Sequence, residues 1–211
     1  MSALLALPLD CAVAARALGD AALSGDLYLA QPTTRGIRVA VIDGLGHGPE
    51  AARAAESARA TLAAAADETP ERLIESCHQS LRATRGAALT LAELDRERSE
   101  MTWVAVGNVE GMVLRVGADG AREKIYVLAR GGIVGHRLPP LRRQTVALKP
   151  GDLLILATDG IRAGFDEALD PRAPPQRNAD AVLRRYGRKA DDALVLVGRW
   201  RGPHPAAGPP S

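Results

Sequence analysis

The sequence has few aromatic residues and few cysteines. Aromatic side chains make up 3% of its 211 residues, so a hydrophobic core has to be built from Leu, Val, Ile and Ala. Cys11 and Cys77 are the two cysteines, and they lie far apart without the spacing of a zinc motif. We therefore expect two buried free thiols and no cysteine metal site.

Long apolar runs and an excess of one charge are also absent. No uninterrupted apolar run approaches the roughly 20 residues of a membrane span, and the first ten residues lack the basic segment and apolar core of a signal peptide. Lys and Arg number 27 against 25 Asp and Glu, which gives a formal net charge of +2. This balance provides no electrostatic footprint for nucleic acid. The prediction is a cytoplasmic protein that binds neither membrane nor nucleic acid.

The residues that are present predict a packed domain. Hydrophobic residues make up 46% of the chain, and the length suits one domain, placed over residues 1–201. The Pro- and Gly-rich tail at 202–211 is expected to be disordered. Strands are expected at 2–7, 27–30, 37–42, 87–94, 101–106, 111–116, 124–129, 145–148, 153–158 and 193–200, helices at 49–66, 69–81 and 178–187, and either at 11–18. Helices segregated from antiparallel strands indicate an α+β layered fold.

Three aspartates stand at the ends of apolar, strand-like runs. Asp43 and Asp159 each follow such a run and precede a glycine, and Asp191 opens the last run. Carboxylate oxygens suit hard cations such as Mg²⁺ and Mn²⁺. Two such ions ~3.5–4 Å apart form a phosphoryl-transfer clamp. Gly44 would let its carbonyl or a water approach a metal without an intervening side chain. The pattern suggests a shared metal site.

Other interpretations of these residues were weighed. Asp-Gly pairs are common in hairpin turns, and Asp119 and Asp152 fit that role because each lies in a clear turn. The glycine-rich turn after Asp43 lacks the spacing of the dinucleotide fingerprint and the Gly-Lys-Ser/Thr ending of a P-loop. His47 fits either a general acid or a loop imidazole bonded to the backbone. Arg130 fits either a phosphate ligand or a solvated loop arginine.

Six short motifs occur in a familiar order. They are Ser24-Gly25-Asp26, Asp43-Gly44-Leu45-Gly46-His47-Gly48, Arg85-Gly86-Ala87-Ala88-Leu89-Thr90, Val106-Gly107-Asn108, Thr158-Asp159-Gly160 and Asp191-Asp192-Ala193-Leu194. Together they resemble the metal-dependent serine/threonine phosphatases of the PPM, or type 2C, superfamily. The bacterial branch with the sporulation stage II E and Rsb stress phosphatases is the most similar. The resemblance implies a four-layer α-β-β-α sandwich with two central, mainly antiparallel sheets flanked by helices.

The resemblance also implies a two-metal site with Mn²⁺ or Mg²⁺. By position, Asp43 would bridge both ions and Gly44 would give its carbonyl to one of them. Asp159 and Asp191 would ligate the other ion. Asp43, Asp159 and Asp191 are therefore the expected catalytic residues.

The chain departs from the wider superfamily at some of these positions. Asp26 matches a motif acid that would act through a metal-bound water, because the glutamate that often precedes it is Gly25 here. Asp191 is preferred to Asp192, since the family's ligand is the first residue of its acidic pair. The histidine that follows Asp-Gly in many eukaryotic members is Leu45, which leaves a general acid unassigned.

The compact length is similar to that of the stand-alone feedback phosphatases of stressosome systems, with no sensor domain expected ahead of the catalytic unit. The implied activity is attack of a metal-activated water on phosphoserine or phosphothreonine. The implied partners are phosphorylated STAS-domain (sulfate-transporter/anti-sigma-antagonist) proteins of the stressosome, and the reaction would reset the stress response. Two alternatives stay open. One is a phosphatase of a partner-switching anti-sigma-factor antagonist, and the other is a non-catalytic module that binds a phosphoprotein.

Overall fold

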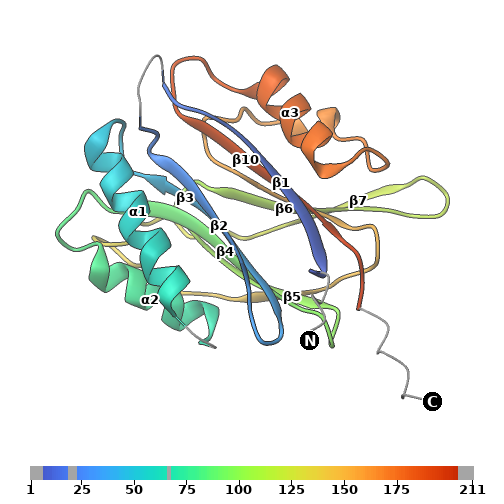
Figure 1. Ribbon diagram of the computed structural model, residues 1–211, viewed down its shortest axis with the longest axis horizontal. Coiled ribbons are helices and arrows are strands. Elements are labelled where there is room, and N and C mark those ends of the chain that lie inside the picture. Colours follow the sequence, from blue (N-terminus) through green and yellow to red (C-terminus); the bar gives the residue numbers. More distant parts are fainter. Residues whose placement is uncertain (1–6, 19–22, 66–67, 204–211) are drawn as a thin grey trace, which may run out of the picture.

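The computed structural model describes residues 7–18, 23–65 and 68–203. In this part of the chain, ten strands form two five-stranded sheets in which every neighbouring pair is antiparallel (Figure 1). The strand expected at 2–7 and the tail expected at 202–211 lie almost wholly outside the described residues. The division of the chain at residue 201 stays a prediction.

The two sheets have the following strand orders. Sheet A runs β1 (Leu9–Arg16), β10 (Ala193–Trp200), β9 (Leu153–Ala157), β6 (Glu110–Val116) and β7 (Arg122–Tyr126). Sheet B runs β2 (Asp26–Pro32), β3 (Gly36–Gly44), β4 (Ala87–Asp95), β5 (Glu100–Val106) and β8 (Gln144–Ala147). The first and last strands of the described chain, β1 and β10, are therefore neighbours.

Helices cover the outer face of each sheet. Figure 1 shows α3 (Pro175–Tyr186) against sheet A, and α1 (Pro49–Ala64) with α2 (Pro70–Ser80) against sheet B. Buried side chains form one hydrophobic cluster between the sheets and one under the helices on each side. This is the predicted four-layer α-β-β-α sandwich.

The sequence of β3 explains its central position. Val39 and Val41 belong to the cluster between the sheets, whereas Ala40 and Ile42 belong to the cluster beneath α1 and α2. A strand with both faces covered reads as a continuous apolar run. One face of α1 consists mainly of alanines, including Ala55 and Ala58, and is fully buried, so the helix lies close against the sheet.

Some local predictions are corrected. Residues 11–18, ambiguous in the sequence, contribute to strand β1. β7 ends at Tyr126 and not at 129, because the chain crosses there from sheet A to sheet B. The Val127 N–H still donates to the Gly111 carbonyl of β6 in sheet A, whereas the Arg130 N–H donates to the Ala105 carbonyl of β5 in sheet B. Apolar residues continue past Tyr126, so the composition of the sequence does not show where β7 ends. A 3₁₀ helix, η1 (Phe165–Ala168), was also not expected.

Two further expectations concern cysteines and membranes. Cys77 is buried, and burial raises the pKa of its thiol to about 12. Cys11 is only partly buried, so the prediction of two buried thiols holds for one of them. Among the described helices, none combines the length and apolar character needed to cross a membrane.

Candidate functional site

The predicted acids gather at one end of the sandwich. Asp26 begins β2 and pairs directly with Asp43 near the end of β3. Residues directly opposite in an antiparallel pair project from the same face, with Cβ atoms about 5 Å apart. Asp43 shares the face of Val39 and Val41, which points between the sheets.

Sheet A brings its own acids to the same place. Asp159 follows the end of β9, and Asp191 lies just before β10, the strand that pairs with β9. The Thr158 hydroxyl donates a 2.7 Å hydrogen bond to Asp26 Oδ2 and accepts a 2.9 Å bond from the Leu194 N–H. Thr158 therefore ties the acid of sheet B to the strand ends of sheet A.

Burial and mutual repulsion disfavour ionisation of these carboxyl groups. Asp26 is 4% exposed, and burial raises its pKa to about 7, opposed by the hydrogen bond from Thr158 and reinforced by nearby aspartates. Burial raises the pKa of Asp43 to about 8, with the charges of Asp26, Asp159 and other aspartates adding to the shift. Burial, followed by the charge of Asp159, also raises the pKa of Asp191. The shifts show that these acids lie close enough to interact electrostatically.

The two members of the acidic pair have different surroundings. Asp192 is 4% exposed, and its oxygens accept hydrogen bonds from the Leu18 N–H at 2.7 Å and the Gly25 N–H at 2.8 Å. The carboxylate of Asp192 is thus already bound by two backbone donors, and these bonds hold the segment that leads into β2 against the start of β10. Asp191 is less buried and, among the described residues, accepts a hydrogen bond only from the neighbouring backbone N–H of Asp192. This contrast supports Asp191 as the member available for a ligand.

Asp159 is exposed and is oriented by a neighbouring side chain. Asn108, in the turn between β5 and β6, donates from Nδ2 to Asp159 Oδ2 at 2.6 Å. Neither Asn108 nor Thr158 was assigned a role from the sequence, although both stand inside the recognised motifs. For Thr158 the available signal was its position directly before Asp159, whereas Asn108 has no aspartate beside it in the sequence.

Two glycines of the motifs are required by close backbone contacts. A Cβ on Gly44 would lie 2.1 Å from the Ala51 carbonyl oxygen of α1, and one on Gly160 would lie 1.8 Å from the Asp192 carbonyl oxygen. The Gly44 N–H also donates to the Gly25 carbonyl at 3.0 Å. These contacts bring the backbones next to the acids together in a way that no side chain would allow.

The acids fit a divalent cation that retains water. Among the ion pairs of the described residues, none involves Asp26, Asp43, Asp159 or Asp191. Partly buried carboxylates without a basic partner favour binding of a cation. Within the described ranges, however, no three His, Cys, Asp or Glu side chains converge into a ready-made metal site. Waters would therefore complete the coordination, as Mg²⁺ sites commonly require.

The other candidates are not tied to these acids. His47 is exposed, and its ring makes none of the hydrogen bonds or ion pairs found among the described residues. Arg130 is also exposed and is fixed only through its backbone, which pairs with β5. Both assignments stay open.

Comparisons with known proteins agree with this architecture. The profile of the family described as Stage II sporulation protein E (SpoIIE) matches residues 33–201. The phosphoserine phosphatase RsbX of Bacillus subtilis (strain 168) is 26% identical over 175 residues, which cover 83% of this chain and 86% of RsbX.

Solved structures show the same fold. A chain from a study of the bacterial stressosome, as a modular system adapted to control secondary messenger signalling, has a TM-score of 0.81 and 33% identity, covering 90% of this chain and 99% of that one. RsbX in complex with magnesium has a TM-score of 0.79 and 23% identity, covering 90% and 94%. The PP2C phosphatase domain of SpoIIE from Bacillus subtilis has a TM-score of 0.70 and 24% identity, covering 90% and 63%.

The fold is shared with PP2C phosphatases, and the family match together with the similarity to the phosphatase RsbX identifies the class as a PP2C-type phosphatase. The chain belongs to the stage II sporulation protein E family. The predicted family, fold and enzyme class are confirmed.

Proposed function

We propose that this protein is a metal-dependent phosphatase that hydrolyses phosphoserine or phosphothreonine on STAS-domain proteins of a stressosome, thereby resetting a stress response. The observation that carries the proposal is the group of aspartates between the two sheets, which lack basic partners among the described residues. The similarity to RsbX and to a stressosome-associated chain supports the choice of substrate.

The proposed cofactor is Mg²⁺ or Mn²⁺, as two ions. Oxygen ligands favour these hard cations, and a solved structure of RsbX contains magnesium. In this proposal Asp43, the Gly44 carbonyl, Asp159 and Asp191 would hold the ions, and Asp26 would act through a water.

The reaction is hydrolysis of a phosphate monoester. Bound divalent ions supply Lewis-acid polarisation of the phosphoryl group and lower the pKa of a nearby water. Water attacks phosphorus, the bond to the serine or threonine oxygen breaks, and inorganic phosphate and a free hydroxyl are formed. The chain's own contribution is orientation: Thr158 holds Asp26, Asn108 holds Asp159, and the backbone donors on Asp192 keep it turned away from the reaction.

The proposal includes a cytoplasmic location and a single catalytic domain over residues 1–201. Serine and threonine residues of signalling proteins are phosphorylated by ATP-dependent kinases, and a phosphatase that reverses this reaction has to meet the same substrates. The family match over residues 33–201 supports the extent of the domain.

The test compares wild type with Asp43→Asn in phosphate release from a phosphorylated STAS-domain protein with Mn²⁺. We expect the variant to lose at least ~10²-fold in kcat, because a neutral amide cannot hold two cations together. Asp119→Asn is the control, since Asp119 lies in the turn after β6, where it accepts a local hydrogen bond from the Ala121 N–H. Equal rates for wild type and Asp43→Asn would remove the basis of the proposal.

The same assay separates the alternatives. Rapid release from an isolated anti-sigma-factor antagonist, with none from stressosome proteins, would favour a partner-switching phosphatase. Metal-independent binding of the phosphoprotein without turnover would favour a non-catalytic binding module. Retention of the aspartates of all the core motifs argues against that last alternative.

A further inference from the structure

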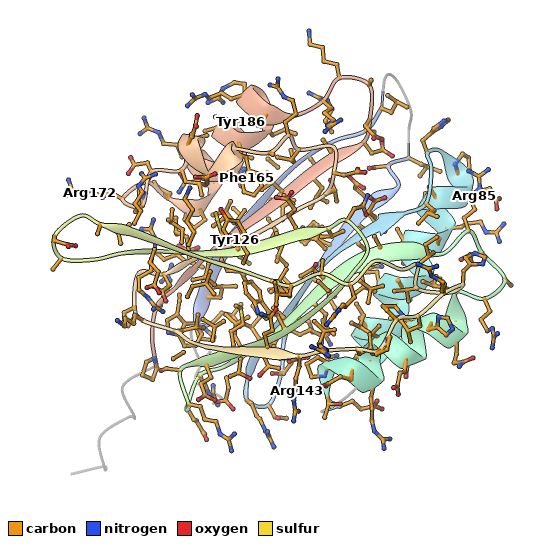
Figure 2. The ribbon with its side chains drawn as sticks, turned by 180° about the vertical axis from the view of Figure 1, so that it is seen from behind. Arg85, Tyr126, Arg143, Phe165, Arg172 and Tyr186 are labelled. Atoms are coloured by element: carbon orange, nitrogen blue, oxygen red, sulfur yellow. The ribbon has the colours of Figure 1, made fainter. Side chains whose placement is uncertain are left out.

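A cleft opens beside Asp159, between the β5–β6 turn, the end of β7 and the loop after β9. Its volume is about 590 Å³, and Asp159 and Asn108 are among its lining residues. Tyr126 and Phe165, which lie next to each other in Figure 2, form part of its apolar wall. Because Asp159 belongs to the proposed site, a phosphorylated side chain that reaches the acids through this cleft has to pass the groups that line it.

The charges that line the cleft are mostly negative. Glu110, Asp159 and Asp166 carry carboxylates, and Asp166 is paired with Lys124. In the part of the chain that the structure describes, Arg188 is the one arginine or lysine among the lining residues. A phosphate monoester carries a charge of about −1.5 to −2 near pH 7, so carboxylates alone would repel it. Arg188 offers the basic partner that such a group needs.

The backbone of Arg188 is fixed to the loop that carries Asp159. Its N–H donates a 2.7 Å hydrogen bond to the Gly160 carbonyl, and its own carbonyl accepts a bond from the Arg16 guanidinium. The preceding residue, Gly187, forms a β-bridge with Ile161. The start of the Arg188 side chain is therefore held in a constant position relative to Asp159.

The guanidinium itself is uncommitted. Arg188 is exposed, and its side chain makes no hydrogen bond or ion pair with any described residue, although its charge is near enough to oppose in part the rise in the Asp191 pKa that burial and Asp159 cause. Arg162 provides the contrast, because its guanidinium donates to the carbonyls of Arg185 at 2.5 Å and Tyr186 at 3.3 Å. An exposed arginine is most often simply solvated. Arg188 differs from such a solvated arginine because its backbone is anchored to the Asp159 loop and its side chain lines the cleft.

We propose that Arg188 binds the phosphoryl oxygens of the substrate and, after hydrolysis, those of inorganic phosphate. The planar guanidinium presents paired N–H donors that match the geometry of a phosphate group. The inference rests on the proposed function for its substrate and adds to it a phosphate-binding residue supplied by the protein.

The experiment measures binding of inorganic phosphate to the Mn²⁺-loaded protein by calorimetry, for wild type, Arg188→Ala, Arg188→Lys and Lys189→Ala. Lys189 is the matched control, because it is an exposed neighbouring cation that does not line the cleft. We expect the Kd for phosphate to rise at least ~10-fold in Arg188→Ala and less in Arg188→Lys, which keeps the charge but loses the paired donors. Lys189→Ala should stay within ~2-fold of wild type. The KM for p-nitrophenyl phosphate should rise with the Kd, with a smaller change in kcat.

Three results would overturn the inference: an unchanged Kd in Arg188→Ala, an equal loss in Lys189→Ala, or a parallel loss of Mn²⁺ affinity in Arg188→Ala. The last result would mean that Arg188 maintains the metal site and does not hold phosphate. Arg188-dependent phosphate binding by a wild-type protein that releases no phosphate from a phosphoprotein would support the inference and contradict the proposed function.

Discussion

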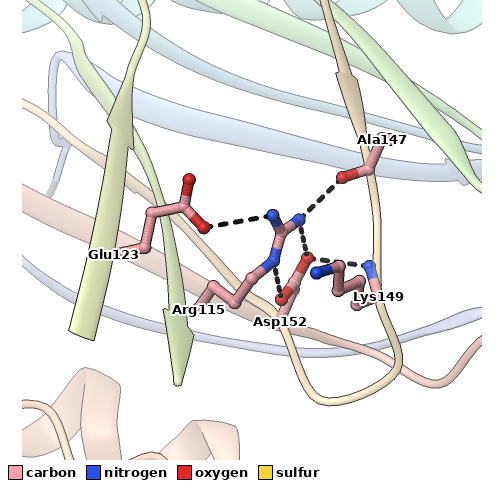
Figure 3. Close-up of polar contacts among 5 residues, drawn as sticks. All are labelled: Arg115, Glu123, Ala147, Lys149 and Asp152. Atoms are coloured by element: carbon pink, nitrogen blue, oxygen red, sulfur yellow. Dashed lines mark hydrogen bonds and ion pairs between the residues drawn. The ribbon is translucent and has the colours of Figure 1, made fainter. Parts of the chain in front are cut away.

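Two aspartates in this molecule are almost equally buried and have opposite surroundings. Asp152, 3% exposed, accepts hydrogen bonds from the Arg115 guanidinium at 2.8 and 3.1 Å and from the Lys149 N–H at 2.8 Å (Figure 3). Asp26, 4% exposed, accepts a hydrogen bond from the Thr158 hydroxyl and lies among other carboxylates. A buried carboxylate with a guanidinium partner stabilises a turn, whereas one without a basic partner is suited to binding a cation.

The largest expected effect comes from breaking the satisfied pair. Arg115→Met would leave Asp152 buried without its guanidinium and should lower the free energy of unfolding by about 3 kcal/mol. In thermal unfolding this corresponds to a decrease in Tm of roughly 10 °C for a chain of this size. Arg172→Met is the control, because Arg172 is an exposed arginine nearby whose side chain bonds to no described residue. A similar Tm for both variants would show that the Arg115–Asp152 pair is not stabilising.

Adding metal should stabilise the aspartate group and leave the Asp152 turn unaffected. At a Mg²⁺ or Mn²⁺ concentration of 100 times Kd, linkage predicts about 2.7 kcal/mol, or an increase in Tm of roughly 5–10 °C. The increase should be much smaller in Asp43→Asn and should persist in Arg115→Met. If the increase in Tm were lost in Arg115→Met but kept in Asp43→Asn, the metal would bind near Asp152 and not near Asp43.

The metal-free protein should become less stable as the pH rises. The folded-state pKa values of about 7 for Asp26 and about 8 for Asp43 lie above the ordinary value of 3.8. The folded state therefore binds more protons than the unfolded state between about pH 4 and pH 8, and stability falls as pH rises through this window. With a chelator present, we therefore expect a lower Tm at pH 8 than at pH 5. Asp43→Asn should flatten this dependence, and an equally steep curve would argue against mutual repulsion of the acids.

The smallest effect should come from removing the Thr158 hydroxyl, which donates a hydrogen bond to Asp26. Thr158→Val keeps the side-chain shape but removes the donor to Asp26 and the acceptor for the Leu194 N–H. We expect a loss of about 1–2 kcal/mol in unfolding free energy and a weaker Mn²⁺ affinity. Thr102→Val, which loses only a partly exposed contact with Thr145, is the matched control. Equal Mn²⁺ affinity in both variants would mean that Thr158 does not orient the site.

The sequence predicts which aspartates gather at the strand ends better than it predicts the pairings and hydrogen bonds that hold them there. Asp43 and Asp159 follow recognisable buried strands, and the ordered motifs led to the family and the sandwich fold. Local patterns do not reveal which strand ends meet, so the pairing of Asp26 with Asp43 needed the structure. The bond from Thr158 to Asp26 spans 132 positions of the chain and lies beyond any local periodicity.

The same limit explains the residues whose roles were not recognised. The motif resemblance favours Asp191 over Asp192 as a ligand, but the two backbone donors that hold Asp192 are visible only in the structure. The end of β7 was misjudged because a chain that crosses from one sheet to the other can stay as apolar as a strand. Tertiary hydrogen bonds, and not composition, decide both cases.

The pairing of β1 with β10 has a consequence for biosynthesis. Leu9 lies opposite Trp200 in sheet A, and Asp191 lies two residues before the start of that last strand. Sheet A cannot be completed, and Asp191 cannot join the other acids, until residues 193–200 have been synthesised and have left the ribosome. Because such distant pairings form late in folding, a nascent chain that stops before β10 will contain Asp26, Asp43 and Asp159 without a completed site. Activity should therefore appear only once β10 has been made and has paired with β1.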